Sequence, residues 1–237
     1  MYVRTFAFAT IFAGLFMFGG GTRCEDNRPI GERNEKETVP LPAPRTAGTM
    51  SLEEALSIRR SIRAYSDEPL SLRETSQLLW AAQGITSPRG FRTAPSAGAL
   101  YPMELYLVVS EVEGLTPGVH HYDPHEHTLR RTKEGNFRRR LADAALGQSA
   151  IRNAPLNLVV TAVYERTARK YGDRAVRYVR MEAGHVGQNL YLQATALGLG
   201  TVTIGAFYDE RVKEVLGIEE EPLYIMPIGN PKSTTQR

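Results

Sequence analysis

The chain contains almost no cysteine. Cys24 is the one cysteine among 237 residues. A single thiol excludes an intramolecular disulfide, a CxxC redox pair and a zinc site made of several thiolates. Any redox chemistry of this protein would therefore need a bound cofactor to carry the electrons.

A large excess of charge of either sign is also missing. The formal net charge is +3, with 23% charged and 42% hydrophobic residues. This balance argues against a nucleic-acid partner or a membrane-surface partner, but it is compatible with an anionic cofactor. The hydrophobic fraction is sufficient for a core without a metal or disulfide, and the length indicates one domain, or one domain plus an appendage.

The first 49 residues do not have the composition of a folded domain. Arg4 precedes an uncharged, mostly apolar run over 5–21, followed by small residues, which is the order found in secretory signals. We expect residues 1–24 to be a signal peptide or membrane anchor, so that the protein is exported or anchored. Membrane contact is expected only through this segment, if it is uncleaved or lipidated at Cys24. The alternative is a mis-assigned start codon upstream of a cytosolic protein.

Residues 25–49 are polar, charged and proline-rich, and are predicted to form a disordered tether. The folded domain is predicted to cover residues 50–237. Capping boxes at Ser51 and Ser71 open two helices, and a long helix with apolar residues at helical spacing is predicted over 174–197. Further helices are predicted at 137–146 and 209–216, and strands at 104–109, 119–122, 128–132, 156–163, 201–204 and 223–228. Interleaved helices and strands together with a hairpin predict an α+β fold rather than a doubly wound parallel sheet.

A cluster of cations follows the first predicted helix. Arg59, Arg60 and Arg63, with the hydroxyl of Ser61, lie within five residues. Arginine donates paired hydrogen bonds to phosphate, so this cluster is a candidate anion site. The alternative is that the cations only compensate the dipole at the helix C-terminus.

Four sequence blocks, in order, resemble signatures of the nitroreductase superfamily. They are the cation cluster followed by Tyr65, the run PSAGALYP at 95–102, GLGT at 198–201 leading to IGAF at 204–207, and MPIGNP at 226–231. The second block resembles in particular the SagB-type, or thiazoline-oxidase, branch. The resemblance covers essentially residues 50–232. It implies a nitroreductase-like fold, with a mixed, mainly antiparallel sheet flanked by helices, and a homodimer with FMN at the subunit interface.

The same resemblance implies a role for each motif residue. Arg59, Arg60 and Ser61 would hold the FMN phosphate and ribityl chain, and Arg63 would lie beside flavin N1, where a cation favours the reduced state. The partner subunit would approach the same flavin with its second block, through Pro95, Ser96, Ala97, Gly98 and Leu100. Gly200 and Thr201 would bring the backbone close to the ring, and Lys232 would complete the phosphate site.

The resemblance implies an FMN-dependent oxidoreductase that transfers hydride through flavin N5. The small-molecule substrate would be a quinone, a nitro compound or an azoline-type heterocycle, with NAD(P)H as one candidate electron donor. NAD(P)H is scarce outside the cytoplasm, which conflicts with an export signal. The alternative function is an exported or anchored flavin-binding electron relay without substrate turnover of its own.

No acid–base catalyst, metal or nucleic-acid partner is expected. His120 and His121 are adjacent on a predicted strand and so point to opposite faces, and His125 and His127 flank a turn. These four histidines are therefore not predicted to form a metal site. His185, within the long helix, is predicted to be packed or to lie at an interface.

Overall fold

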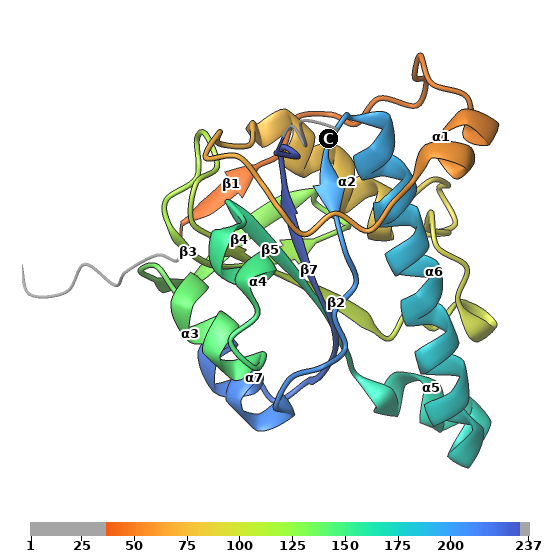
Figure 1. The fold of residues 1–237 in the computed structure, drawn as a ribbon. Helices are drawn as coiled ribbons and strands as arrows, with labels where there is room; N and C mark the ends of the chain where they lie inside the picture. Colours follow the sequence, from red (N-terminus) through yellow and green to blue (C-terminus); the bar gives the residue numbers. More distant parts are fainter. Residues whose placement is uncertain (1–36, 233–237) are drawn as a thin grey trace, which may run out of the picture. The chain divides into compact units, whose positions relative to one another are not determined.

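A computed structural model describes residues 37–232, which form a seven-stranded sheet flanked by helices (Figure 1). The strand order is β1-β4-β3-β2-β5-β7-β6. Every pairing between neighbouring strands is antiparallel, and parallel contact is limited to isolated bridges such as Ser61 with Thr201. The strands are β1 (Thr38–Pro40), β2 (Met103–Val109), β3 (Gly118–Asp123), β4 (Thr128–Glu134), β5 (Leu156–Ala162), β6 (Gly200–Thr201) and β7 (Glu221–Gly229).

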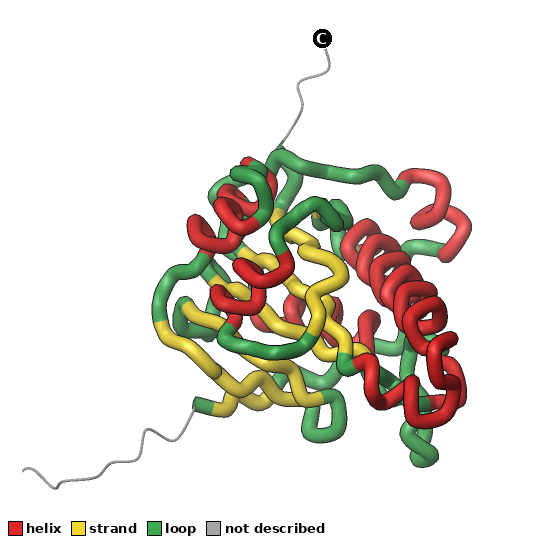
Figure 2. Tube along the Cα trace, turned by 90° about the horizontal axis from the view of Figure 1, so that it is seen from below, coloured by secondary structure: helices red, strands yellow, loops and turns green. Residues whose placement is uncertain are grey.

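Helices cover both faces of the sheet. The α-helices are α1 (Leu52–Ile58), α2 (Leu72–Gln83), α3 (Arg138–Ala144), α4 (Ser149–Asn153), α5 (Tyr164–Tyr171), α6 (Ala175–Ala196) and α7 (Asp209–Leu216), with short 3₁₀ turns at η1 (Ala97–Ala99) and η2 (Gly172–Arg174). In Figures 1 and 2, α6 lies along one side of the sheet, and α3, α4 and α7 lie on the other. The predicted α+β fold is confirmed. The sequence analysis did not predict α4 and α5.

Alternation along the strands builds two cores. In β2, Leu105 and Leu107 face the core under α2 and α6, whereas Tyr106 and Val108 face the core under α3, α4 and α7. Successive strand residues point to opposite faces, so a strand with both faces covered is apolar throughout. The β5 strand is buried at all seven positions, as predicted for a central strand.

The helix starts follow the sequence closely. Ser71 and Glu74 form a complete capping box, in which Glu74 N donates to Ser71 Oγ at 3.2 Å and Ser71 N donates to Glu74 Oε2 at 2.8 Å. At Ser51 only the side-chain cap is present, with Glu54 N donating to Ser51 Oγ at 3.0 Å. Each cap satisfies a backbone N–H that has no partner within its helix.

The predicted strand at 201–204 is shorter than expected. β6 ends at Thr201, and only Ile204 returns to the sheet, through a bridge to Ile225. Between them, Thr203 N donates to the side chain of Tyr191 on α6 at 2.9 Å. The backbone therefore leaves the sheet because a helix side chain supplies a hydrogen-bond partner.

The prediction of a disordered tether over 25–49 is wrong for residues 37–49. β1 pairs with β4, and Leu41 is buried in the core. Ser76 Oγ donates to Pro42 O at 2.6 Å, and Arg45 exchanges two hydrogen bonds with the Gln77 side chain. This segment cannot order itself, but the open edge of β4 and the polar side of α2 supply partners for its backbone. The predicted domain boundary at residue 50 is too late. Residues 1–24 and 25–36 lie outside the described residues.

The histidines contact separate partners. His120 is buried, with Nε2 2.9 Å from Thr116 O, and burial lowers its pKa despite that bond. His121 Nε2 lies 2.6 Å from Glu104 Oε2, and His127 Nε2 lies 2.8 Å from Ser76 Oγ. Between residues 37 and 232, no group of three His, Cys, Asp or Glu side chains is placed to hold a metal ion, and no helix is long and apolar enough to cross a membrane.

Candidate functional site

The cation cluster after α1 lies against the third sequence block. Ile62 N donates to Thr201 O at 2.9 Å, so the segment from Ser61 to Arg63 runs beside β6. Gly200 is required at this contact because a Cβ there would lie 2.6 Å from Ile62 Cγ2. The structure thus brings together two motifs that are about 140 residues apart in the sequence.

The closing block joins the same place. Tyr65 pairs with Pro231, and Lys232 N donates to Ala64 O at 3.0 Å. The buried Tyr65 hydroxyl donates to carbonyls of both segments, at 2.7 Å to Ile62 O and 3.1 Å to Pro227 O, and burial raises its pKa. Lys232 is therefore held next to Arg63 through backbone contacts, although its own side chain is exposed.

Tyr191 on α6 links these motifs, and the sequence analysis did not identify it. Its hydroxyl lies 2.9 Å from Ser61 Oγ and accepts from Thr203 N, while the Arg59 guanidinium lies 5.0 Å from the ring centroid. Burial raises its pKa, but the hydrogen bonds with Ser61 and Thr203 and the charge of Arg59 outweigh burial, and the net shift is downward. Its position on the apolar face of the long helix gave no signal of this role.

The arrangement fits an anionic ligand. Ser61, Arg63 and Lys232 are exposed, and neither the Arg63 nor the Lys232 side chain has a hydrogen bond or ion pair with another described residue. The Thr201 hydroxyl oxygen is buried without a hydrogen-bond partner among these residues. Exposed guanidinium and ammonium groups without partners are the donors that a phosphate requires. Arg60 differs, since its guanidinium donates to Ser57 O and Arg59 O and is turned back to the end of α1.

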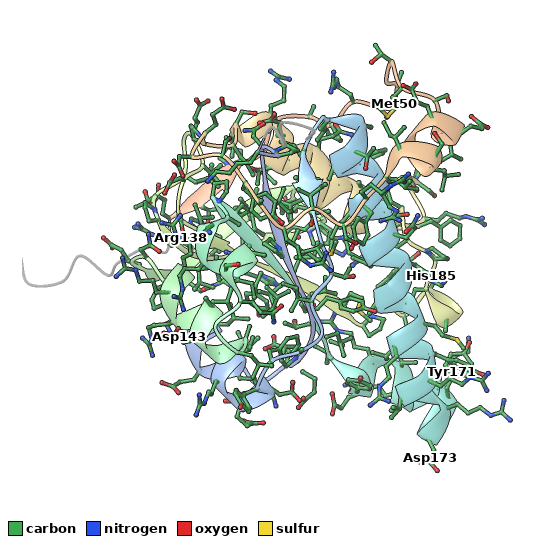
Figure 3. All side chains as sticks on the ribbon, viewed as in Figure 1. Met50, Arg138, Asp143, Tyr171, Asp173 and His185 are labelled. Atoms are coloured by element: carbon green, nitrogen blue, oxygen red, sulfur yellow. The ribbon has the colours of Figure 1, made fainter. Side chains whose placement is uncertain are left out.

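The second block lies elsewhere. Pro95, Ser96 and Ala97 line a cavity of about 290 Å³ together with Glu182 and His185, and with Tyr178 and Met181 of α6. Figure 3 marks His185 midway along α6, where its side chain is exposed and Nδ1 lies 3.4 Å from Pro95 O. His185 is thus not buried in the domain, and its place at an interface stays a prediction. Leu100 is half-buried at the end of this loop.

Gly98 of this block is in the left-handed region, with φ of 65°. A Cβ added there would meet the Tyr171 hydroxyl at 2.9 Å and the Lys170 ammonium at 3.0 Å. The end of α5 therefore lies directly over the second block. Lys170 and Tyr171 were not identified from the sequence, because the contact joins residues that are about 70 positions apart.

The two groups of motifs contact opposite faces of α6. Tyr191 and Gly187 face Thr203, and Arg180 lies on the same side, whereas Glu182 and His185 face the second block. At about 100° per residue, the centres of these two faces differ by roughly 150°. Within one chain, the predicted flavin-binding residues therefore form two separate surfaces.

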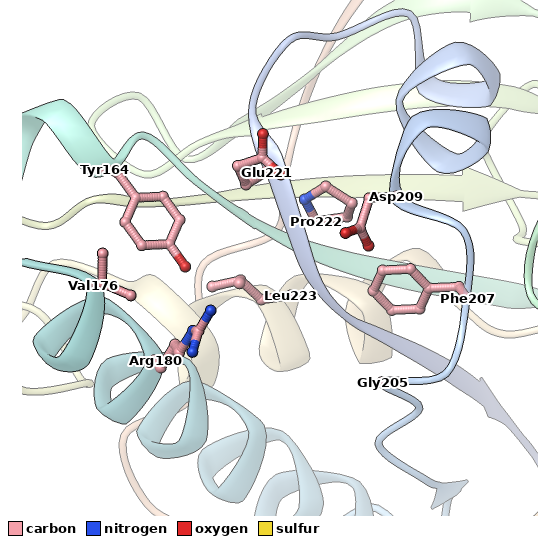
Figure 4. Close-up of a pocket in the computed structure, with 9 residues that line it drawn as sticks. All are labelled: Tyr164, Val176, Arg180, Gly205, Phe207, Asp209, Glu221, Pro222 and Leu223. Atoms are coloured by element: carbon pink, nitrogen blue, oxygen red, sulfur yellow. The ribbon is translucent and has the colours of Figure 1, made fainter.

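A further cavity of about 440 Å³ lies beyond Gly205, on the Tyr191 side of α6 (Figure 4). Its lining includes the rings of Tyr164 and Phe207, the apolar side chains of Val176 and Leu223, and the charged side chains of Arg180, Asp209 and Glu221. Arg180 has no hydrogen bond or ion pair with any residue between 37 and 232. Gly205 and Phe207 belong to the third block, so this cavity and the cation cluster are lined by the same sequence block.

The α+β sheet brings the first, third and closing sequence blocks together around one cluster of cations. The Nitroreductase family model matches residues 56–230, and the chain belongs to this family. It is accordingly an oxidoreductase of this family, as the sequence motifs predict, and its predicted nitroreductase-like fold is confirmed.

Similar proteins agree on the family, and one of them supports the branch. A Methanocaldococcus jannaschii protein named as a nitroreductase is 53% identical over 180 residues, covering 76% of this chain and 91% of the relative. A solved structure from Ralstonia eutropha, described as a nitroreductase, has a TM-score of 0.73 and 30% identity, covering 84% of this chain and 92% of that one. The microcin B17-processing protein of Escherichia coli is 29% identical over 68% of this chain and supports the SagB-type branch. The matched region spans 62% of that relative's length.

Proposed function

We propose that this oxidoreductase is a homodimer that binds FMN between its subunits and transfers hydride through flavin N5 to or from a small organic substrate. The observation that carries the proposal is the position of the motifs on opposite faces of α6. A helix with its side chains is about 10 Å thick, so one flavin cannot contact both faces within one chain. A second chain related by two-fold symmetry would bring its second block to the first chain's cation site.

The proposed role of each ligand group is the one that the family resemblance implies. Arg59, Ser61 and Lys232 would hold the phosphate and ribityl chain, and Arg63 would stabilise negative charge on the reduced ring. The backbone at Gly200 and Thr201 would come close to the flavin ring, because neither residue has a bulky side chain. The chemistry that FMN supplies when bound is acceptance and return of a hydride at N5. Arg60 contributes less than its neighbours, since it is already engaged by backbone carbonyls.

The cavity beyond Gly205 is the proposed substrate site. Its volume of about 440 Å³ lies within the range of about 300–1,000 Å³ that small-molecule sites occupy. Tyr164 and Phe207 offer ring surfaces to a flat substrate, and the free Arg180 guanidinium offers donors to an anionic group (Figure 4). We therefore expect a planar heterocyclic or aromatic substrate that carries a negative charge.

Among substrate classes, an azoline-type heterocycle is favoured by one further contact. Aromatisation of an azoline gives a hydride to the flavin and a proton to a base. Lys170 and Tyr171 lie against Gly98. In the proposed dimer they would approach the partner's flavin together with the second block, where they could take this proton. The similarity to a microcin-processing protein points the same way. A quinone or nitro compound, with NAD(P)H as donor, needs no such base.

The second candidate is a flavin-binding electron relay without turnover of its own. The segment 1–24 motivates it, since we propose that this segment exports or anchors the protein, and NAD(P)H is scarce outside the cytoplasm. The two functions differ in whether bound flavin passes through repeated cycles of reduction and reoxidation with a small substrate.

The test begins with the visible spectrum of the purified full-length protein and the mass of the released chromophore. We expect a flavin band close to one FMN per chain. NADH, NADPH and an azoline-containing peptide are then tried as reductants without oxygen, with a quinone as acceptor. Repeated turnover supports the enzyme, and a single reduction without turnover supports the relay. A protein that stays colourless after FMN is added would contradict both.

A further inference from the structure

The loop that carries the second block has an unfavourable backbone conformation. Gly98, Ala99 and Tyr101 have φ of 65°, 54° and 45°. Residues with a Cβ rarely adopt this left-handed region, so hydrogen bonds have to keep the loop in its shape. Ser96 contributes from within the loop, since its hydroxyl oxygen accepts from Tyr101 N at 2.9 Å. The loop also needs a contact that fixes it to the rest of the domain.

Arg166 of α5 makes such a contact. Its Nη1 donates to Tyr101 O at 3.1 Å, and its Nη2 lies 2.5 Å from Glu104 Oε1. Two nitrogens of one planar guanidinium therefore bind two acceptors, one in the loop and one at the start of β2. The rigid fork of arginine suits this arrangement, whereas lysine offers a point charge on a flexible chain.

Glu104 is held from its other side as well. Its Oε2 lies 2.6 Å from His121 Nε2, and its side chain is 15% exposed. The Tyr106 ring packs on His121 with centroids 4.8 Å apart, and the Tyr106 hydroxyl donates to Glu220 Oε1 at 3.0 Å. Burial raises the pKa of Glu104, but the hydrogen bonds with His121 and Arg166 and the charge of Arg166 outweigh burial. The net shift is downward, so Glu104 gives the guanidinium a charged partner in a fixed position.

The same helix carries the residues that lie over the second block. Lys170 is four positions after Arg166, so both leave α5 on the same face. A Cβ added at Gly98 would meet the Tyr171 hydroxyl at 2.9 Å and Lys170 Nζ at 3.0 Å. Figure 3 labels Tyr171 at this end of the helix. Arg166 therefore joins the loop to the helix that covers it.

We propose that Arg166, oriented by Glu104, is a positioning residue that holds the 95–101 loop and the end of α5 together as one flavin-contacting surface. This inference rests on the proposed function, in which this second-block surface contacts the flavin of the partner subunit. Loss of the Arg166 fork frees the Tyr101 carbonyl, and the loop then relaxes from its positive-φ conformation. The cation cluster of the same chain is unaffected.

The first test is the FMN dissociation constant of the full-length protein, measured by fluorescence titration. Arg166→Met removes the donors but keeps an unbranched side chain, and it should weaken binding about tenfold, as loss of one hydrogen bond from a charged donor does. Arg166→Lys keeps the charge without the fork and should have intermediate affinity. Arg169→Met is the matched control on α5 and should bind like wild type. Arg169 is exposed and has no hydrogen bond or ion pair with another described residue.

A second test separates positioning from a general loss of structure. Co-expressed Arg166→Met and Arg63→Glu chains form mixed dimers, each with one site built from an intact cation cluster and an intact second-block surface. About a quarter of all sites should then regain wild-type affinity, since half of the dimers are mixed. With Gly98→Val in place of Arg63→Glu, none should regain it, because both chains carry a defective second-block surface. A variant that merely disturbs its whole chain would not be rescued by either partner.

The outcomes distinguish this inference from the proposed function. A wild-type protein that binds no FMN contradicts the proposed function, as does bound FMN without any recovery when Arg63→Glu and Gly98→Val are co-expressed. If that pair recovers sites, wild-type affinity in Arg166→Met, or its lack of rescue by Arg63→Glu, overturns only this inference. If Arg166→Met does not fold, as judged by circular dichroism, Arg166→Lys replaces it in both tests, and wild-type affinity in Arg166→Lys then overturns the inference.

Discussion

The two faces of α6 serve different purposes. The face with Arg180, Gly187 and Tyr191 is lined by free cations and by the backbone after β6. The face with Glu182 and His185 supports a strained loop and contains a buried acid. The first face presents cations to a ligand. The second face contacts the 95–101 loop, whose conformation is held by hydrogen bonds. In the proposed homodimer, this division would explain why the sequence motifs of one chain describe a site that needs two chains.

The largest expected effect comes from mixing two defective chains. Arg63→Glu reverses a charge on the first surface, and Gly98→Val places a β-branched residue at positive φ on the second. Each variant alone should bind almost no FMN. Co-expressed, they should recover about a quarter of the wild-type sites, since half of the dimers are mixed and each has one intact site.

FMN content per chain of the purified mixture measures this recovery. Each variant expressed alone is the control. No recovery in the mixed sample would mean that both faces of α6 act on ligands of their own chain.

Within the first surface, Arg63→Ala should weaken FMN binding by about 10- to 100-fold. Loss of a hydrogen bond from a charged group costs about 1.5–3 kcal/mol, and each 1.4 kcal/mol is tenfold in affinity. Arg63→Lys, the matched control, should keep most of the affinity because the positive charge remains. Calorimetric titration with FMN gives both values, and wild-type affinity in Arg63→Ala would contradict the placement of the FMN site.

The smallest effect is expected at the cavity beyond Gly205. Arg180→Gln should raise KM for an anionic substrate about tenfold and leave FMN affinity and kcat nearly unchanged, since Arg180 contacts neither the cation cluster nor the second block. A neutral substrate of the same shape is the control, and its KM should not change. An equal rise in KM for both substrates would show that the substitution disturbs the structure of the cavity rather than removing a charge interaction with the substrate.

Much of the fold could be predicted from the sequence because its signals are local. The capping residues at Ser51 and Ser71, the apolar repeat of α6 and the continuous run of β5 each lie within a short window. Residues 37–49 were mispredicted because their order depends on β4 and α2, which are distant in the sequence. Tyr191 and Glu182 were missed for a related reason. Both are buried on α6 against segments that are distant in the sequence, so no local pattern marks them.

The sequence by itself determined the family, the fold class and the residue types that a flavin phosphate requires, because these depend on composition, spacing and short motifs. Only the tertiary structure decided which motifs meet and which stay apart. That depends on the direction in which each side chain leaves α6, and on contacts such as Ile62 with Thr201 and Ser61 with Tyr191, which join residues far apart in the chain.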